Sequence, residues 1–252
     1  MLLMKQKKYF CIRFYNPGMS NSWFRFKRFL VNQEDCAMKV GTDGVLLGAW
    51  ADIRPGCRVL DVGTGTGVIA LMAAQRGAEH VIAVEIDTAT AAQAARNAAD
   101  SEWADRIEVL SLDVADYVTD ARFDRILSNP PYFRDSLRSP DLGRNTARHN
   151  DALSYETLTG CAASLLAPDG QLCVVLPYDS VGEFVRCALL KGLYLVRRTD
   201  VVTAPGRSPK RSLLAFSNTE SQLAADVLAI RDDSGNETAD YINLVKEFYL
   251  NY

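Results

Sequence analysis

Asp61-Val62-Gly63-Thr64-Gly65-Thr66-Gly67 is the stretch that decides how this chain folds. It follows an apolar, strand-like run, Arg58–Leu60, and precedes Val68–Arg76, whose apolar residues recur with helical periodicity. Three glycines at alternate positions allow a tight turn in which no Cβ keeps the backbone away from a ligand. A strand, a glycine-rich turn and a helix in this order are typical of nucleotide-binding α/β folds, although the turn alone does not identify the ligand.

From residue 57 onward, strand-like and helical segments alternate. Strand-like runs are expected at Arg58–Leu60, His80–Val84, Ile107–Leu112, Phe123–Ser128, Gln171–Leu176, Tyr194–Thr203 and Ser212–Ser217. Helical periodicity is found at Val68–Arg76, Thr88–Asp100, Ser154–Ala167 and Asp179–Lys191. Repeated units of this length predict an α/β fold with a seven-stranded, mostly parallel sheet covered by helices on both faces, and the last two strands are expected to form an antiparallel hairpin at its edge. A C-terminal helix is expected to face the core through Tyr241, Leu244, Val245, Phe248 and Tyr249.

The composition is that of a globular enzyme. The chain has 252 residues, of which 48% are hydrophobic, and a formal net charge of −3. No apolar run approaches the roughly 20 residues that a membrane span needs, and the N-terminus lacks the apolar stretch of a signal peptide. The six cysteines form no CxxC pair and there are only two histidines, so we expect reduced core thiols and no metal site. A cytoplasmic protein without a membrane partner or an obligatory protein partner is predicted.

Acidic residues stand at the ends of the next two predicted strands. Glu85 lies 18 residues beyond Gly67, and Asp113 ends the third strand. A carboxylate at the first position can accept hydrogen bonds from both hydroxyls of an unphosphorylated ribose, and one at the second can accept from an adenine amino group. Either could instead be a helix N-cap. Because ligands of open α/β sheets bind at the carboxyl ends of strands, the series favours a ligand that contains adenosine.

Asn129-Pro130-Pro131-Tyr132 follows the fourth predicted strand. Two prolines cannot extend a strand ladder, because each lacks a backbone N–H. The tetrapeptide presents an amide oxygen, a backbone carbonyl and an aromatic ring, a set that can hold a flat group bearing an amine. A proline-rich turn without function is the alternative. Phe133 adds a second aromatic surface, and the polar stretch 133–150 is a candidate lid.

Basic residues cluster in a chain that is acidic as a whole. The candidate contacts to a phosphate backbone are Arg25, Lys27, Arg28, Arg207, Lys210 and Arg211. The net charge argues against indiscriminate binding of nucleic acid, but local clusters near a site fit an RNA or DNA backbone held at one place. For each cluster alone, solvated surface is the alternative.

Taken together, these residues resemble the class I S-adenosylmethionine-dependent methyltransferases. Asp61–Gly67 is similar to the first motif of that family, and Asn129–Tyr132 to the motif of its amino-group methyltransferases. The resemblance implies a Rossmann-like fold and S-adenosylmethionine as cofactor, with S-adenosylhomocysteine as product. It further implies cofactor contacts from Asp61, Gly63, Gly65, Gly67, Glu85, Asp113 and Asn129.

The N-terminal part narrows the resemblance to the bacterial tRNA1(Val) adenine N6-methyltransferases. Phe24–Phe29 and Asp35–Trp50 closely resemble the start of that family, and Phe248–Leu250 resembles its end. Its members methylate the adenosine at position 37 of tRNA, beside the anticodon. The resemblance implies that Lys39, Thr42 and Asp43 border the methionine end of the cofactor.

The same resemblance implies a division of the chain. The family usually starts near Met19, so residues 1–22 are expected to be a disordered or non-native extension. Residues 23–56 are expected to be a helical segment that covers the cofactor, and residues 57–252 the methyltransferase domain.

The expected mechanism places the target amine between two acceptors. Asn129 Oδ1 and the Pro130 carbonyl accept its two hydrogens, and Tyr132 stacks on the base, with Pro131 and Phe133 as further substrate contacts. Three alternatives stay open: a protein glutamine N5-methyltransferase that acts on a release factor, an adenine N6-methyltransferase that acts on rRNA or DNA, and a nucleotide-binding module with a degenerate site. Release-factor enzymes usually carry a longer N-terminal domain, and DNA or rRNA enzymes usually carry an added recognition module.

Overall fold

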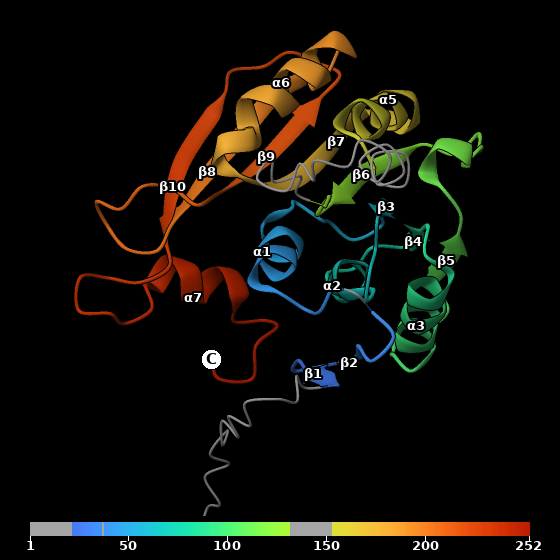
Figure 1. The fold of residues 1–252 in the computed structure, drawn as a ribbon, viewed down its shortest axis with the longest axis horizontal. Helices are drawn as coiled ribbons and strands as arrows, with labels where there is room; N and C mark the ends of the chain where they lie inside the picture. The colour runs from blue at the N-terminus through green and yellow to red at the C-terminus, as the bar shows by residue number, and fades with distance from the viewer. Residues whose placement is uncertain (1–21, 37, 132–152) are drawn as a thin grey trace, which may run out of the picture.

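The computed structural model describes residues 22–36, 38–131 and 153–252. Figure 1 shows the arrangement of its elements. In chain order these are β1 (Trp23–Arg25), β2 (Leu30–Asn32), α1 (Thr42–Trp50), β3 (Arg58–Val62), α2 (Val68–Gln75), β4 (His80–Glu85), α3 (Thr88–Ala99), β5 (Ile107–Ser111), η1 (Val114–Asp116), β6 (Phe123–Ser128), α5 (Tyr155–Leu165), β7 (Leu166–Pro177), η3 (Tyr178–Ser180), α6 (Val181–Leu190), β8 (Tyr194–Val202), β9 (Arg211–Ser217), β10 (Ala224–Ala229) and α7 (Ala239–Val245).

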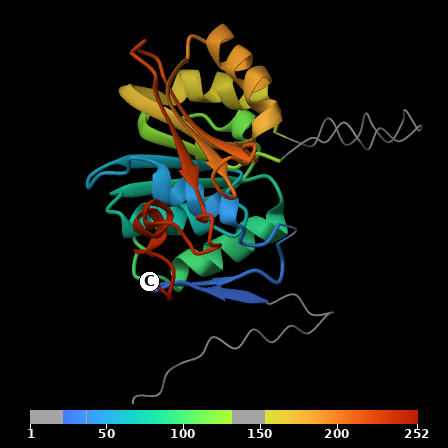
Figure 2. The same ribbon diagram turned by 90° about the vertical axis from the view of Figure 1, so that its left-hand side faces the viewer.

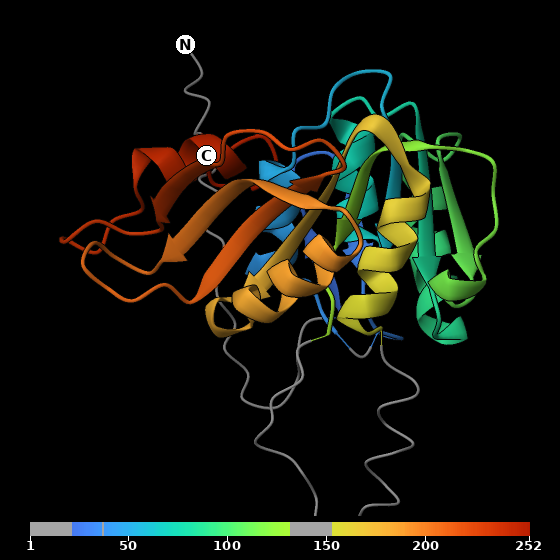
Figure 3. The same ribbon diagram turned by 90° about the horizontal axis from the view of Figure 1, so that it is seen from above.

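Among the described residues, eight strands form one sheet in the order β10-β8-β9-β7-β6-β3-β4-β5. Strand β9 runs antiparallel to both of its neighbours, β7 and β8, and every other neighbouring pair is parallel. Helices α5 and α6 cover one face of the sheet, and α1, α2, α3 and α7 lie on the other (Figures 1 and 3). The predicted α/β fold with a mostly parallel sheet is confirmed.

The edge of the sheet differs from the prediction of seven strands with a hairpin at the edge. An eighth strand, β10, pairs in parallel with β8 and forms the edge of the sheet, so that β10 separates the β8–β9 hairpin from the edge. The sequence of β10, Ala-Ala-Asp-Val-Leu-Ala, is poor in β-branched and aromatic residues, and only Leu228 among its side chains is buried. Without an apolar run or a clean alternation, it gives little strand signal.

The N-terminal part also differs from the helical segment that was predicted. It begins with a small antiparallel hairpin, β1–β2, and α1 is its one helix among the described residues. The Phe26 ring stacks on Phe29 and on Tyr249, and the Lys27 N–H donates to the Phe248 carbonyl at 2.8 Å. The hairpin therefore packs beside the C-terminal residues (Figure 2).

The C-terminal stripe faces the core, as predicted, but its helix is shorter. Tyr241, Val245 and Phe248 are buried, and α7 ends at Val245, so Phe248 lies beyond the helix. The Thr238 side chain accepts the Tyr241 N–H and caps the start of α7.

Helix α2 is buried along most of its length because it packs on strands β3 and β4 of the sheet and against α1, which lies beside it on the same face. Its residues 68–74 are all buried. Gly48 of α1 permits this close packing, since a Cβ there would lie 2.8 Å from the Met72 sulfur. This contact sets the position of α1, whose first residues reach the functional edge of the sheet.

Candidate active site

Three neighbouring strands bring the predicted site residues to one edge of the sheet. Val62 of β3 pairs with Val84 of β4 and with Ser128 of β6. The residues that follow these positions, in the glycine turn, at Glu85 and at Asn129, therefore lie at adjacent strand ends. The Ser128 hydroxyl donates to the Val62 carbonyl at 2.9 Å and fastens β6 to β3 just before the proline pair.

The glycine turn adopts a conformation that favours glycine. Gly63, Gly65 and Gly67 have φ of 70°, 56° and 82°, in the region that side-chain-bearing residues rarely adopt. No atom among the described residues lies within 4 Å of a Cβ built at Gly63 or Gly65. The turn thus faces open space at its first two glycines, whereas Gly67 is buried against Ala94 and caps α2.

Asp61 lies beneath the turn and is fully buried. The Thr64 hydroxyl donates to its Oδ2 at 2.5 Å, and its Oδ1 has no hydrogen-bond partner among the described residues. Burial raises the pKa of the Asp61 carboxyl to about 7, against the hydrogen bond from Thr64, which lowers it. Asp61 therefore supports the turn from below and does not line the cavity described next.

A cavity of about 340 Å³ opens above the turn. Its walls come from the residues just before α1, from the start of α1, from the glycine turn, from the start of α2 and from the end of β6. The lining residues are Met38, Lys39, Val40, Gly41, Thr42, Asp43, Gly44, Gly63, Thr64, Gly65, Thr66, Val68, Ile69 and Asn129. Of the residues that the sequence assigned to the cofactor, Lys39, Thr42, Asp43, Gly63, Gly65 and Asn129 meet here.

Glu85 and Asp113 bind backbone groups at the ends of β4 and β5. Glu85 accepts the Gly65 N–H at 3.0 Å through Oε2 and the Asp87 N–H at 3.1 Å through Oε1. Asp113 accepts the Ala115 N–H at 2.9 Å and caps η1, which is the N-cap alternative considered above. A carboxylate oxygen has further acceptor capacity, so these bonds leave the predicted ribose and adenine contacts open, and they stay predictions.

At the end of β6, Asn129 is half-buried, Pro130 is buried and Pro131 is exposed. Asn129 belongs to the wall of the cavity, together with residues of the glycine turn. Tyr132, Phe133 and the stretch 133–150 lie outside the described residues, and the roles predicted for them stay predictions.

One ion pair joins a residue predicted to contact the cofactor to a residue predicted to contact RNA. Arg211, at the start of β9, donates through Nε to Asp43 Oδ2 at 2.7 Å, and both side chains are about one quarter to one third exposed. A second cavity, of about 240 Å³, shares Thr42 and Asp43 with the first and is also bordered by Lys210 and Arg211. The predicted cofactor side and the predicted RNA side of the site are thus in direct contact.

The basic residues divide into two groups. Lys27 Nζ donates to the carbonyls of Lys246 at 2.6 Å and Tyr252 at 2.5 Å, and Arg28 forms an ion pair with Glu102 at 2.7 Å. These two side chains therefore have intramolecular tasks. Arg25 is exposed on β1, and Arg207 and Lys210 are exposed in the loop between β8 and β9. The RNA contacts predicted for all of them remain predictions.

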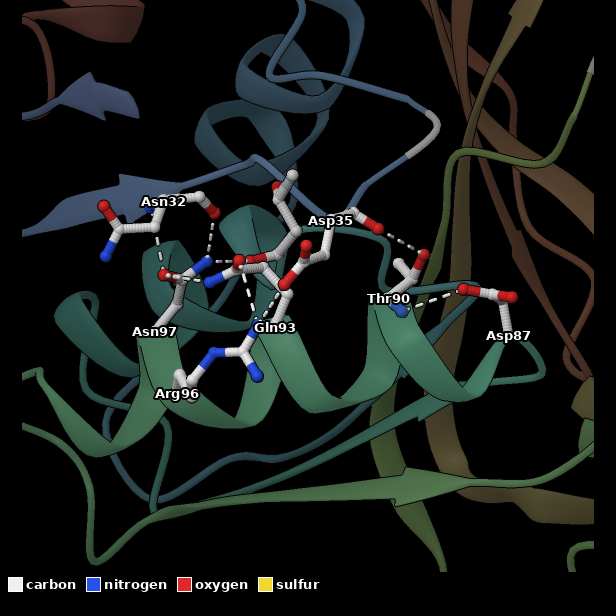
Figure 4. Close-up of polar contacts among 8 residues, drawn as sticks. Asn32, Asp35, Asp87, Thr90, Gln93, Arg96 and Asn97 are labelled. Atoms are coloured by element: carbon white, nitrogen blue, oxygen red, sulfur yellow. Dashed lines mark hydrogen bonds and ion pairs between the residues drawn. The ribbon is translucent and has the colours of Figure 1, made fainter. Parts of the chain in front are cut away.

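The sequence did not single out a set of polar residues on α3. Thr90, Gln93 and Asn97 are buried and face the residues that precede α1 (Figure 4). Their spacing of three and four residues puts them on one side of a helix. The available signal was a polar stripe at helical spacing, in a helix whose other residues are mostly alanine.

The described part of the chain holds neither a cluster of metal ligands nor a membrane-spanning helix. No group of three or more His, Cys, Asp or Glu side chains there could hold a metal ion. No helix there is both long and apolar enough to cross a membrane.

Comparison with known proteins identifies relatives along almost the whole chain. The family model of the methyltransferase small domain matches residues 41–183. A tRNA1(Val) (adenine(37)-N6)-methyltransferase of Bacteroides fragilis is 48% identical over 235 residues, which are 92% of this chain and 99% of the relative. A protein of the same name from Escherichia coli O157:H7 is 44% identical over 231 residues, 90% of this chain and 94% of the relative.

The fold has solved counterparts. The crystal structure of a protein described as a predicted O-methyltransferase, from Agrobacterium tumefaciens, superposes with a TM-score of 0.66 at 24% identity. The match covers 82% of this chain and 96% of that one. At this level of identity the similarity shows the shared methyltransferase fold.

Proposed function

The chain belongs to the family of tRNA1(Val) (adenine(37)-N6)-methyltransferases, and we propose that it transfers a methyl group from S-adenosylmethionine to N6 of adenosine 37 in tRNA1(Val). The observation that carries the chemical part of the proposal is the position of Asn129. Asn129 lines the same cavity as the glycine turn, so an amine held by its side-chain amide would lie beside the group bound over the turn.

The cavity fits S-adenosylmethionine in two respects. The open space at the Cβ positions of Gly63 and Gly65 lets a ligand approach the backbone closely, and the cavity also brings Lys39, Thr42 and Asp43 to the same space. The residues proposed to hold the cofactor, or in the case of the buried Asp61 and Gly67 to shape the turn beneath it, are Lys39, Thr42, Asp43, Asp61, Gly63, Gly65, Gly67, Glu85, Asp113 and Asn129. When bound, this cofactor supplies an electrophilic methyl group on a sulfonium.

The chain's own residues act on the acceptor. The lone pair of an exocyclic adenine amine is conjugated into the ring, which makes the nitrogen a poor nucleophile. Hydrogen bonds from the amine to Asn129 Oδ1 and to the Pro130 carbonyl hold it and direct its lone pair toward the cofactor. Alignment of two reactants supplies up to roughly 7–11 kcal/mol, and the two carbonyl dipoles stabilise positive charge that develops on the nitrogen. Because the methylated nitrogen loses its proton readily to water, no strong base is needed.

The remaining predicted substrate contacts complete the proposal. Tyr132 stacks on the target base, which is worth about 1–3 kcal/mol for a base on an aromatic ring, with Pro131 and Phe133 beside it. A base in the anticodon loop leaves its stack at a lower cost than one in a duplex. Residues 57–252 form the methyltransferase domain, and residues 23–56 cover the cofactor.

The test is methyl transfer to unmodified substrates. The purified protein is incubated with S-adenosylmethionine and a tRNA1(Val) transcript, and nucleosides are analysed by mass spectrometry. We expect N6-methyladenosine in this transcript and none in the same transcript with guanosine at position 37. A release factor, an rRNA fragment and a DNA duplex are offered in parallel, and methylation of one of these alone would overturn the assignment of tRNA.

The role of Asn129 is tested by Asn129→Ala. We expect transfer to be lost while the dissociation constant of S-adenosylhomocysteine changes little, since the backbone turn still binds the cofactor. Asn218→Ala, at an exposed position after β9, is the control. Undiminished turnover by the Asn129 variant would remove this side chain from the mechanism.

A further inference from the structure

Helix α3 turns a polar stripe, rather than an apolar one, toward the N-terminal part of the chain. Thr90, Gln93 and Asn97 are 7%, 4% and 1% exposed. The stripe faces Asn32, at the end of β2, and the cap segment, by which we mean residues 33–36 and 38–40 (Figure 4). Buried polar side chains are costly unless they are paired, so the partners of each indicate what the stripe is for.

Asn97 binds two separate parts of the backbone. Its Nδ2 donates to the Asn32 carbonyl at 2.8 Å and to the Thr66 carbonyl at 2.9 Å. Its Oδ1 accepts the Asn32 N–H at 3.0 Å and the Gln93 amide at 3.4 Å. Both donors of the primary amide are therefore used, and they are used on different segments.

The two segments lead to different parts of the cavity wall. Thr66 belongs to the glycine turn, and Asn32 leads directly into the cap segment, whose Met38, Lys39 and Val40 line another part of the wall. The cap segment is closed on itself, because Gln33 Oε1 accepts the Val40 N–H at 2.9 Å. A shift at Asn32 is therefore passed through Gln33 to the residues that face the ligand.

We propose that Asn97 is a positioning residue that sets the distance between these two parts of the cavity wall, and so the affinity for S-adenosylmethionine, without touching the ligand. This inference rests on the proposed function for the identity of the ligand. Asn97 is not among the residues that line the cavity, so its role follows from its hydrogen bonds and not from contact with the ligand.

The cap segment has a second attachment that provides a matched control. Arg96 donates to Asp35 Oδ2 at 2.5 Å, and both side chains are more than half exposed. Exposed ion pairs contribute little to stability. If every contact that holds the cap segment had the same effect on ligand affinity, loss of the Arg96–Asp35 ion pair would raise the dissociation constant as much as loss of the Asn97 contacts.

The experiment compares Asn97→Asp with Arg96→Gln by titration calorimetry with S-adenosylhomocysteine. The first change keeps the shape of the side chain and its acceptor for the Asn32 N–H but leaves at most one of the two donors, since an ionised carboxyl has none and a protonated one has a single O–H. We expect the dissociation constant to rise about tenfold for Asn97→Asp, the usual size of a lost buried partner, and less than about twofold for Arg96→Gln. In methyl transfer, the KM for S-adenosylmethionine should rise while kcat and the KM for tRNA stay close to wild type.

A structural role alone would give a different result. Irreversibly misfolded protein lowers the number of binding sites per protein and the apparent kcat without changing the dissociation constant. Reversible unfolding raises the apparent dissociation constant only by the inverse of the folded fraction, which circular dichroism without ligand measures; a tenfold rise in a variant that is mostly folded is therefore not a stability effect. If Asn97→Asp does not fold, Asn97→Ser retains one hydroxyl donor and undergoes the same titration. An unchanged dissociation constant in the folded variant overturns the inference. Failure of the wild-type protein to bind S-adenosylhomocysteine would instead contradict the proposed function.

Discussion

The buried Asp61 makes the stability of the fold depend on pH in a way that one substitution isolates. Its pKa in the folded chain is about 7, against an ordinary value of 3.8, chiefly because of burial. The folded chain thus holds the proton more tightly than the unfolded chain. The contribution of Asp61 to the free energy of unfolding is fully present below about pH 4, falls as the pH rises, and becomes constant above about pH 7.

The size of the effect follows from the shift. One pKa unit corresponds to about 1.4 kcal/mol, so the full shift amounts to about 4 kcal/mol. Between pH 5 and pH 8 the contribution of Asp61 to the free energy of unfolding falls by about 3 kcal/mol, because the rest of the roughly 4 kcal/mol is lost below pH 5. Asp61→Asn removes the titrating group and keeps an acceptor for the Thr64 hydroxyl.

The assay is urea unfolding of both proteins across this pH range. The free energy of unfolding of the wild type minus that of Asp61→Asn should fall by about 3 kcal/mol from pH 5 to pH 8. Other carboxyls, such as Asp87, titrate in both proteins and cancel in the difference. A difference that stays constant with pH would show that Asp61 is ionised in the folded chain throughout, and the assignment of its raised pKa would be wrong.

Three further substitutions test separate parts of the structure. Gly65→Ala should raise the dissociation constant of S-adenosylhomocysteine, because the added Cβ would enter the cavity at a φ of 56°. Gly206→Ala, at a φ of 70° in the β8–β9 loop, carries similar strain away from the cavity and should not raise it. Equal effects of the two changes on calorimetric binding would contradict the role of the turn. Gly48→Ala should destabilise the fold by about 1–3 kcal/mol in urea unfolding, because its Cβ would be overpacked against Met72. Gly182→Ala has no atom within 4 Å of its Cβ and should not destabilise the fold. Arg207→Ala combined with Lys210→Ala should weaken tRNA binding and reduce its salt dependence, and Lys191→Ala, beyond the end of α6, should change neither; filter binding at several salt concentrations that shows no difference would make the loop ordinary surface.

The fold was predicted correctly where neighbouring residues form a clear pattern of apolar residues or of helix caps. Strands such as His80–Glu85 are continuous apolar runs, and the helices that follow them start at recognisable caps, such as Asp87, which accepts the Thr90 N–H. Strand β10 was missed because its pairing with β8 is made by the backbone, and backbone pairing leaves little trace in residue type. The β1–β2 hairpin was missed because its contacts are with the C-terminal residues.

The same distinction applies to the site. Motif residues such as Gly63 and Asn129 follow adjacent parallel strands and line one cavity, and the roles predicted for them stay predictions. The tasks of Lys27 and Arg28 were not predictable, since their partners, the Tyr252 carbonyl and Glu102, are distant in the chain. Asn97 was overlooked for a similar reason: a buried amide is recognised by its partners, and these lie 31 and 65 residues away.

The packing of the β1–β2 hairpin beside the C-terminal residues has a consequence for the order in which the protein matures during synthesis. The carbonyls that Lys27 binds belong to residues 219 and 225 positions later. A chain still on the ribosome lacks these partners even when the glycine turn, α3 and the tetrapeptide have all been made. Contacts of such long range form late, because a large loop must close first. We expect the hairpin to dock only after residues 246–252 have been made, and the cofactor cavity, whose wall continues from β2, to become competent only then. The time at which the cavity forms during synthesis would thus depend on residues that are distant from it in the chain.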